Sequence, residues 1–306
     1  MAEYSPMMQH YLKTKEEHSD CILFYRLGDF YEMFFDDALT ASRELEITLT
    51  GKDCGQEERA PMCGIPYHAV DSYLNKLIAR GYRVAICEQM EDPKQVKGLV
   101  KREVIRIVTP GTNLSQQALD ETRNNYLMCL VYDNKQFGIA ITDISTGDFY
   151  TTEVESVKEL YDEINRFAPA EIICNDSFYM SGASLDDFKN RLHISVSVLD
   201  TWYMDEAVSV QKIKDHFKVA TLDGLGLSDF PSGTMASGAL LLYLYETQKN
   251  SLSNLTRIIP YRSGGYWTRR RQPWAQGSCA AGSNSPLLRR RRLQRDRMLL
   301  RSFIMI

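Results

Sequence analysis

Apolar positions recur along the first part of the chain with two different periods, which predict short strands and helices. The apolar run over 21–27 predicts a buried strand, and the apolar spacing after it predicts a helix over 30–44. Asp29 suits the N-cap of that helix, and Glu32 then falls at N3, which completes a capping box. A helix from Val70 to Gly81 is expected to follow a polar loop over 51–59 and a rigid Pro- and Gly-containing segment over 61–68. Further strands are predicted at 46–50, 83–87 and 100–108.

The pattern changes after residue 115, where strands come first and helices follow. A three-stranded meander is predicted over 125–133, 136–145 and 148–154, with tight turns at 134–135 and 146–147. A helix is then predicted over 156–167, strands over 170–174 and 193–199, and a helix over 205–217. An apolar, largely buried helix over 235–249 follows. Such alternation is typical of α/β proteins. We therefore expect two α/β domains, over 1–115 and 116–261, and an irregular arginine-rich tail over 262–306.

The formal net charge of −4 over 306 residues conceals an uneven distribution. Residues 116–261 carry a net charge of −10, whereas residues 1–115 carry −4. Residues 262–306 hold eleven arginines, no lysine and one acid, a net charge of +10. Because an acidic segment repels a phosphate backbone, any contact with DNA is expected in the first domain.

Composition argues against a secreted protein, a membrane protein and a metal site. The seven cysteines are scattered, no apolar run reaches the length of a bilayer span, and the N-terminus lacks a secretion signal. We therefore expect a cytoplasmic protein that does not bind membranes. Cys54, Cys63 and His68 invite a zinc site, but the chain has no C-x-x-C spacing and five histidines in all, so we reject it.

Phe30 and Glu32 combine an aromatic ring and a carboxylate two residues apart, next to a predicted turn. Such a ring can wedge into a base stack, and such an acid can test an exposed base edge by hydrogen bonding. The local sequence alone favours the capping interpretation, because helix starts far outnumber DNA wedges. The surrounding sequence reverses that preference.

Four blocks, taken in order, resemble the MutS family of mismatch-recognition proteins over residues 6–261. They are Phe24–Glu32, Met62–Val70, Val84–Gln89 and Arg106–Thr112. The resemblance implies a mismatch-binding domain followed by a connector domain with a ribonuclease H-like fold. It also implies that Phe30 stacks on a mispaired or unpaired base from the minor groove and that Glu32 hydrogen-bonds the displaced base. Tyr31 is expected to pack inward.

The same resemblance implies partners. They are mismatched double-stranded DNA and a MutL-like protein, which is expected to meet the connector. A basic cluster in the first domain is the candidate for phosphate contacts, the alternative being a solvated strand edge. Its members are Lys94, Lys97, Lys101, Arg102 and Arg106.

The chain also departs from the family. Family members continue into a helical core and a C-terminal ATPase domain, which binds ATP and Mg and forms the homodimer. No G-x-x-x-x-G-K-[ST] motif occurs in the 306 residues. We therefore expect no enzymatic activity and no cofactor in this chain, and a monomer.

Three interpretations of the tail over 262–306 differ in what they imply. The first is a basic nucleic-acid-binding element, the second is a terminus without function, and the third is a stretch translated out of frame. The abrupt replacement of Lys by Arg and the loss of every Glu favour the third. We expect a frame disruption near Arg262, partly restored near Arg297, and then a premature stop.

Two alternative functions stay open beside mismatch binding. Asp143 and Asp148, on the predicted meander, are candidate ligands for the metal ions of a ribonuclease H-like nuclease. The second alternative is a module that only binds a MutL-like partner, through residues 116–261.

Overall fold

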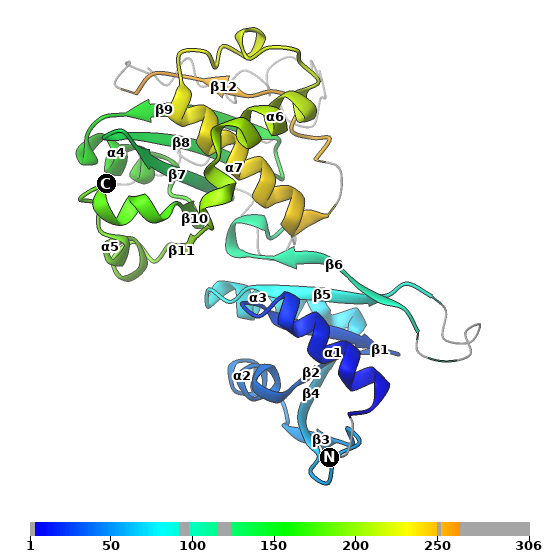
Figure 1. The fold of residues 1–306 in the computed structure, drawn as a ribbon. Coiled ribbons are helices and arrows are strands. Elements are labelled where there is room, and N and C mark those ends of the chain that lie inside the picture. The colour runs from blue at the N-terminus through cyan, green and yellow to red at the C-terminus, as the bar shows by residue number, and fades with distance from the viewer. Residues whose placement is uncertain (1–3, 92–97, 99, 115–123, 250–251, 264–306) are drawn as a thin grey trace, which may run out of the picture. The chain divides into compact units, whose positions relative to one another are not determined.

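The structure, a computed structural model, describes residues 4–91, 98, 100–114, 124–249 and 252–263. They belong to one compact unit over 1–263 that contains two six-stranded mixed sheets (Figure 1). Helices and strands alternate in both parts, so the predicted α/β class is confirmed. Among the described residues, no helix has the length and apolar character needed to span a membrane.

The first sheet has the strand order β3-β4-β2-β1-β5-β6. β1 and β5 are parallel, and all other neighbours are antiparallel. Helices α2 (Phe35–Leu45) and α3 (Val70–Ala79) pack on one face, and α1 (Pro6–Glu17) packs on the other. The strands are β1 (Ile22–Leu27), β2 (Phe30–Phe34), β3 (Thr50–Lys52), β4 (Ala60–Pro66), β5 (Val84–Gln89) and β6 (Arg102–Val108). Two 3-10 turns complete this part, η1 (Tyr67–Ala69) and η2 (Pro110–Thr112).

The predicted helix over 30–44 is wrong in its first five residues, and with it the capping box of Asp29 and Glu32. Residues 30–34 form β2, which pairs with β1 through a two-residue turn, and α2 begins at Phe35. The other neighbour of β2 is β4, in the segment expected to be a rigid entry to the next helix. Pairing on both sides satisfies the backbone of residues 30–34, which explains why a strand forms there instead of a helical turn.

The second sheet has the strand order β11-β10-β7-β8-β9-β12, and its central meander β7–β9 is the predicted one. Helices α6 and α7 cover one face, and α4 and α5 cover the other. The strands are β7 (Leu127–Asp133), β8 (Gln136–Asp143), β9 (Asp148–Val154), β10 (Glu171–Cys174), β11 (Ser195–Val198) and β12 (Ile259–Pro260). The helices are α4 (Val157–Phe167), α5 (Leu185–Asn190), α6 (Glu206–Phe217) and α7 (Pro231–Gln248), with 3-10 turns η3 (Asp176–Met180), η4 (Thr201–Met204) and η5 (Asp223–Leu225).

Helix α7 is buried along most of its length, as its apolar sequence predicts. Its N-terminal turn approaches β8 so closely that a Cβ at Gly138 would lie 2.0 Å from the carbonyl oxygen of Ser232. Only glycine allows that contact between strand and helix backbone. The position therefore determines how α7 seats on the sheet.

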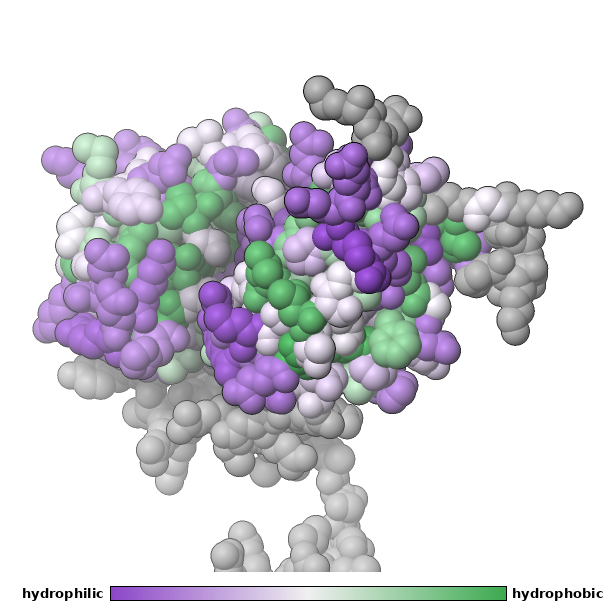
Figure 2. Space-filling view, turned by 90° about the horizontal axis from the view of Figure 1, so that it is seen from below, coloured by the Kyte–Doolittle hydropathy of each residue, from purple (hydrophilic) through white to green (hydrophobic). Residues whose placement is uncertain are grey.

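Exposed apolar side chains are scattered on the surface. The space-filling view shows one face on which hydrophilic residues occupy most of the area and apolar residues form smaller patches (Figure 2). Scattered exposed hydrophobic residues are normal on protein surfaces. Exposure alone therefore does not identify a site. The position and neighbours of an exposed side chain show whether it is a candidate site residue.

Candidate nucleic-acid interface

The β1–β2 hairpin places Phe30 at the tip of the first sheet. Leu27 and Phe30 are cross-strand partners, so the turn consists of Gly28 and Asp29 alone. Gly28 adopts a φ of 57°, a left-handed value that glycine reaches without strain and that two-residue hairpin turns require. Phe30 is 47% exposed, whereas the other residues of β2 are buried or half-buried. The fold therefore presents an aromatic ring on a rigid support.

Alternation along β2 puts Glu32 on the same face as Phe30 and Tyr31 on the opposite face. Tyr31 is buried in the core against α2 and α3, which confirms the predicted inward packing. Its hydroxyl donates a hydrogen bond to Glu88. Burial, followed by this hydrogen bond, raises the pKa of Tyr31 well above its ordinary value. Tyr31 therefore anchors the strand on which Phe30 and Glu32 lie.

Lys52 is the partner of Glu32, and it is a site residue that was not predicted from the sequence. The Nζ of Lys52 lies 2.5 Å from Oε2 of Glu32, and the side chains are 31% and 15% exposed. The two residues are 20 positions apart, on strands that are not neighbours in the sheet. No local pattern signals such a pair, because it depends on how β3, β4 and β2 align.

Arg26 and Tyr67 brace the tip from the other side. The backbone N–H of Tyr67 donates to the carbonyl of Asp29 at 2.9 Å, which fixes the turn to the end of β4. The guanidinium of Arg26 lies 3.9 Å from the centre of the Tyr67 ring, a distance typical of a cation–π contact. Arg26 also lies 3.5 Å from the Glu88 carboxylate. These contacts limit the freedom of the hairpin.

The predicted basic cluster is only partly described. Lys94 and Lys97 lie outside the described residues. Lys101 is exposed and pairs with Glu103 at 2.7 Å. Phosphate contact by these three lysines stays a prediction.

Arg102 and Arg106 lie deeper than an exposed basic patch would place them. Arg102 is 7% exposed, and its guanidinium donates to the backbone carbonyls of Arg26 and Val100, both at 2.9 Å. Arg106 donates to the carbonyl of Thr112 at 3.0 Å, and burial lowers its pKa. This geometry favours a role in holding β6 and the segments beside it for both arginines.

The carboxylate of Asp143 accepts hydrogen bonds from the backbone and a side chain of a turn. Asp143 is buried, and it accepts hydrogen bonds from the backbone N–H of Asn125 and from the N–H and hydroxyl of Ser145 at 2.6–2.9 Å. Asp148 is its cross-strand partner and accepts from Asn124 at 3.2 Å. Among the described residues, no group of three or more His, Cys, Asp and Glu side chains is placed to hold a metal ion. The geometry thus favours the turn-forming role of Asp143 over the nuclease alternative.

A buried carboxylate connects the end of the first domain to the second sheet. Glu171, at the start of β10, is fully buried and accepts hydrogen bonds from the Thr109 hydroxyl, the Gly111 N–H and the Tyr243 hydroxyl at 2.5, 3.0 and 2.7 Å. A Cβ at Gly111 would lie 2.9 Å from Cβ of Leu127, so the turn needs glycine. We call Thr109, Gly111, Glu171 and Tyr243 the junction cluster.

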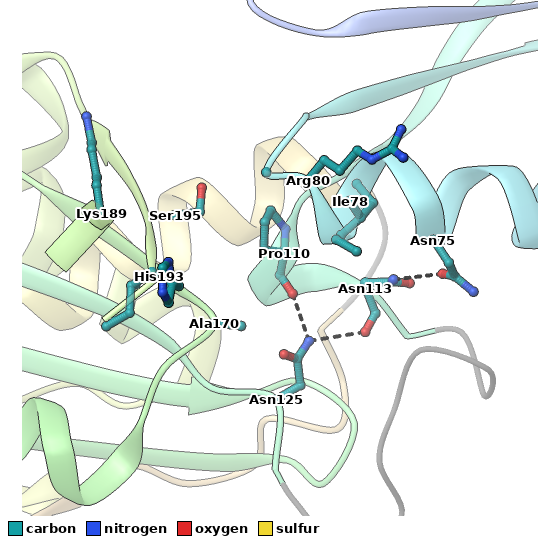
Figure 3. Close-up of a pocket in the computed structure, with 13 residues that line it drawn as sticks. Asn75, Ile78, Arg80, Pro110, Asn113, Asn125, Ala170, Lys189, His193 and Ser195 are labelled. Atoms are coloured by element: carbon teal, nitrogen blue, oxygen red, sulfur yellow. Dashed lines mark hydrogen bonds between the residues drawn. The ribbon is translucent and has the colours of Figure 1, made fainter. Parts of the chain in front are cut away.

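A cavity of about 660 Å³, lined by polar and apolar residues alike, lies beside the junction cluster, between the end of α3 and the segment that leads into β11. Asn125 donates to the carbonyls of Pro110 and Asn113, and Asn113 donates to Asn75 at 2.9 Å (Figure 3). Arg80, at its rim, is paired with Glu44 at 3.0 Å. The amides therefore join the turn after β6 to α3 and to the segment that leads into β7, a structural role for the walls of the cavity.

Comparison with known proteins agrees with this arrangement. The family model described as MutS domain I matches residues 5–117, and the model described as MutS domain II matches residues 125–256. The chain belongs to the MutS family. The first matched range contains all six strands of the first sheet, and the second contains β7 to β11 of the second sheet. The MutS-like blocks recognised in the sequence form the hairpin tip, β4, β5 and the turn after β6.

Three relatives, each named DNA mismatch repair protein MutS, illustrate the similarity. The chain is 63% identical to the protein of Lachnoclostridium phytofermentans over 266 residues, which cover 87% of the chain and 28% of that protein. It is 51% identical to the protein of Acetivibrio thermocellus over 269 residues, 87% of the chain and 31% of the relative. Identity to the Ruminiclostridium cellulolyticum protein is 48% over 264 residues, 85% and 30%. The chain thus spans about three tenths of the length of these MutS relatives.

Proposed function

We propose that this chain takes part in DNA mismatch repair by binding mismatched or looped duplex DNA, with Phe30 as the wedge. The observation that carries the proposal is the exposed ring of Phe30 at the tip of a braced hairpin, with the Glu32 carboxylate on the same face. Phe30 stacks on the mispaired base from the minor groove, and Glu32 accepts a hydrogen bond from the displaced base. The MutS relatives support the general role.

Physical chemistry explains why such a site distinguishes a mismatch from a paired step. A wedge must unstack a base step, which costs a few kcal/mol in paired DNA and less where pairing is already defective. The ring recovers about 1–3 kcal/mol by stacking on the base, whichever base it is. The site therefore recognises the ease of deformation, and one ring serves many mismatches.

The second domain is the proposed contact for a MutL-like partner. Its net charge of −10 over residues 116–261 suits a protein-facing role better than a DNA-facing one. We assign no catalytic step to the chain: the buried Asp143 forms a turn, and the junction cluster holds the domains together.

Binding of the full chain to short duplexes tests the proposal. Fluorescence anisotropy should give tighter binding to a G·T duplex and to a single-base loop than to the same duplex fully paired. Phe30→Ala should remove that preference, because the stacking energy of about 1–3 kcal/mol corresponds to roughly a 5- to 150-fold change in affinity. Leu39, on α2, is also 47% exposed, so Leu39→Ala is a matched control that should leave the preference intact. Equal discrimination by Phe30→Ala and the unaltered chain would refute the wedge.

A further inference from the structure

We propose that Lys52 is a positioning residue for Glu32, and that it makes the site prefer mispaired bases with an exposed ring N–H. The inference rests on the proposed function, because it concerns the carboxylate that is proposed to meet the displaced base. It adds a third residue to the site, from a strand remote from Phe30 and Glu32 in the sequence.

The sheet explains how Lys52 reaches Glu32. Lys52 ends β3, at the edge of the first sheet, and β4 lies between that strand and β2. On β4, Lys52 lies opposite Ala60 and Glu32 lies opposite Gly64, so the lysine side chain reaches Glu32 diagonally across the sheet face, past Met62. The ammonium of Lys52 donates to Oε2 of Glu32 at 2.5 Å and lies 5.7 Å from the centre of the Phe34 ring. The lysine stem thus extends across the sheet face toward β2.

Partial burial makes the pair more than a loose surface contact. Exposed ion pairs contribute little, because two long side chains lose rotamer freedom to form them. Here the side chains are 31% and 15% exposed, so neighbouring atoms already restrict their rotamers and less freedom remains to be lost. The carboxylate of Glu32 is therefore held in one orientation before DNA arrives.

The charge of Lys52 also matters beside a polyanion. A carboxylate brought close to the phosphate backbone without a cation nearby is repelled, whereas a paired carboxylate is not. With Oε2 engaged by Lys52, the second oxygen, Oε1, acts as the acceptor for the base. An ionised carboxylate only accepts hydrogen bonds, so it favours a base that offers an N–H, such as the ring imino group of thymine or guanine.

Two duplexes that differ only in the unpaired base test the inference in the full chain. One carries an unpaired thymine, and the other carries difluorotoluene, an apolar isostere of thymine without the ring N–H. We expect the unaltered chain to bind the thymine duplex roughly 10- to 150-fold more tightly, which corresponds to about 1.5–3 kcal/mol for one hydrogen bond to a charged group. Lys52→Met should bring that ratio close to one, and Lys52→Arg should keep most of it. In a Glu32→Gln background, Lys52→Met should change the ratio no further.

Other outcomes separate failure of the inference from failure of the proposed function. If Lys52→Met weakens binding to thymine, difluorotoluene and paired duplexes alike and lowers the salt dependence, Lys52 only contacts phosphates and the inference is wrong. An unchanged ratio in Lys52→Met, with Phe30→Ala still removing mismatch preference, overturns the inference alone. If Phe30→Ala keeps the full preference for mismatched DNA, the proposed function itself is overturned. Thermal unfolding controls for folding, and Lys52→Gln replaces Lys52→Met if the latter unfolds.

Discussion

Tyr243→Phe isolates one hydrogen bond of the junction cluster with almost no change in volume. In the folded chain the Tyr243 hydroxyl donates to Oε1 of the fully buried Glu171 at 2.7 Å, while Thr109 and Gly111 donate to Oε2. Burial, followed by the Glu171 charge, raises the pKa of Tyr243 well above its ordinary value. A hydrogen bond to a charged group contributes about 1.5–3 kcal/mol, and the acceptor left behind is buried. We therefore expect Tyr243→Phe to lower the free energy of unfolding by about 2 kcal/mol.

Urea unfolding followed by circular dichroism gives that free energy, and hydrogen exchange gives the local effect. The amide of Gly111 donates to the same carboxylate, so its exchange should become faster in Tyr243→Phe. Tyr179 is 64% exposed, and Tyr179→Phe is the matched control, with an expected change within 0.5 kcal/mol. If Tyr243→Phe changed stability no more than the control, Glu171 would not hold the two domains together.

Three further predictions concern the fold. Gly138→Ala should lower the free energy of unfolding by about 3 kcal/mol, since the new Cβ meets a backbone carbonyl 2.0 Å away; at Gly224 nothing lies within 4 Å, so Gly224→Ala should be near neutral in the same urea titration. His216 lies between the Tyr245 hydroxyl and the Leu255 carbonyl, and burial lowers its pKa. Because the imidazole binds a proton more readily in the unfolded chain, the free energy of unfolding should fall as pH drops from 7 to 5, and His216→Gln should flatten that slope. Burial raises the pKa of four thiols to about 12, those of Cys21, Cys63, Cys87 and Cys174. Peptide mapping after treatment with iodoacetamide at pH 8 should therefore find these thiols unmodified in the folded chain and modified after unfolding.

Elements with local causes could be predicted from the sequence. The meander of the second domain is an example, because Asn134 and Lys135 adopt φ values of 49° and 63° in a tight turn and Gly147 adopts 79° in the next. Such turns need only the residues that form them. Strand ends in β7, β8 and β9 accordingly lie within two residues of the predicted ones.

The hairpin that carries Phe30 could not be predicted in this way. Residues 30–34 are apolar at spacings that fit both a helix and a strand, and Asp29 and Glu32 match a helix start. The choice depends on β4, which pairs with β2 from about 30 residues further along the chain. Tertiary hydrogen bonds therefore override a plausible local signal.

The candidate site likewise combines residues that could be predicted from the sequence with residues that could not. Phe30 and Glu32 were found through their resemblance to a family motif, because local physics favoured a helix cap. Lys52 and Glu171 carry no signal in the sequence, since their partners lie 20 and up to 72 residues away. A buried acid such as Glu171 becomes interpretable once its three donors are known.

Photocrosslinking tests the central claim most directly, because it reports which residue touches the mispaired base. A duplex carries 5-iodouracil at a single unpaired position, and the same base is paired with adenine in the control duplex. After irradiation with the full chain, mass spectrometry should find the crosslink on Phe30 with the unpaired base and a much weaker one with the paired base. A crosslink of equal strength on both duplexes, or one on Tyr67 in place of Phe30, would contradict the account.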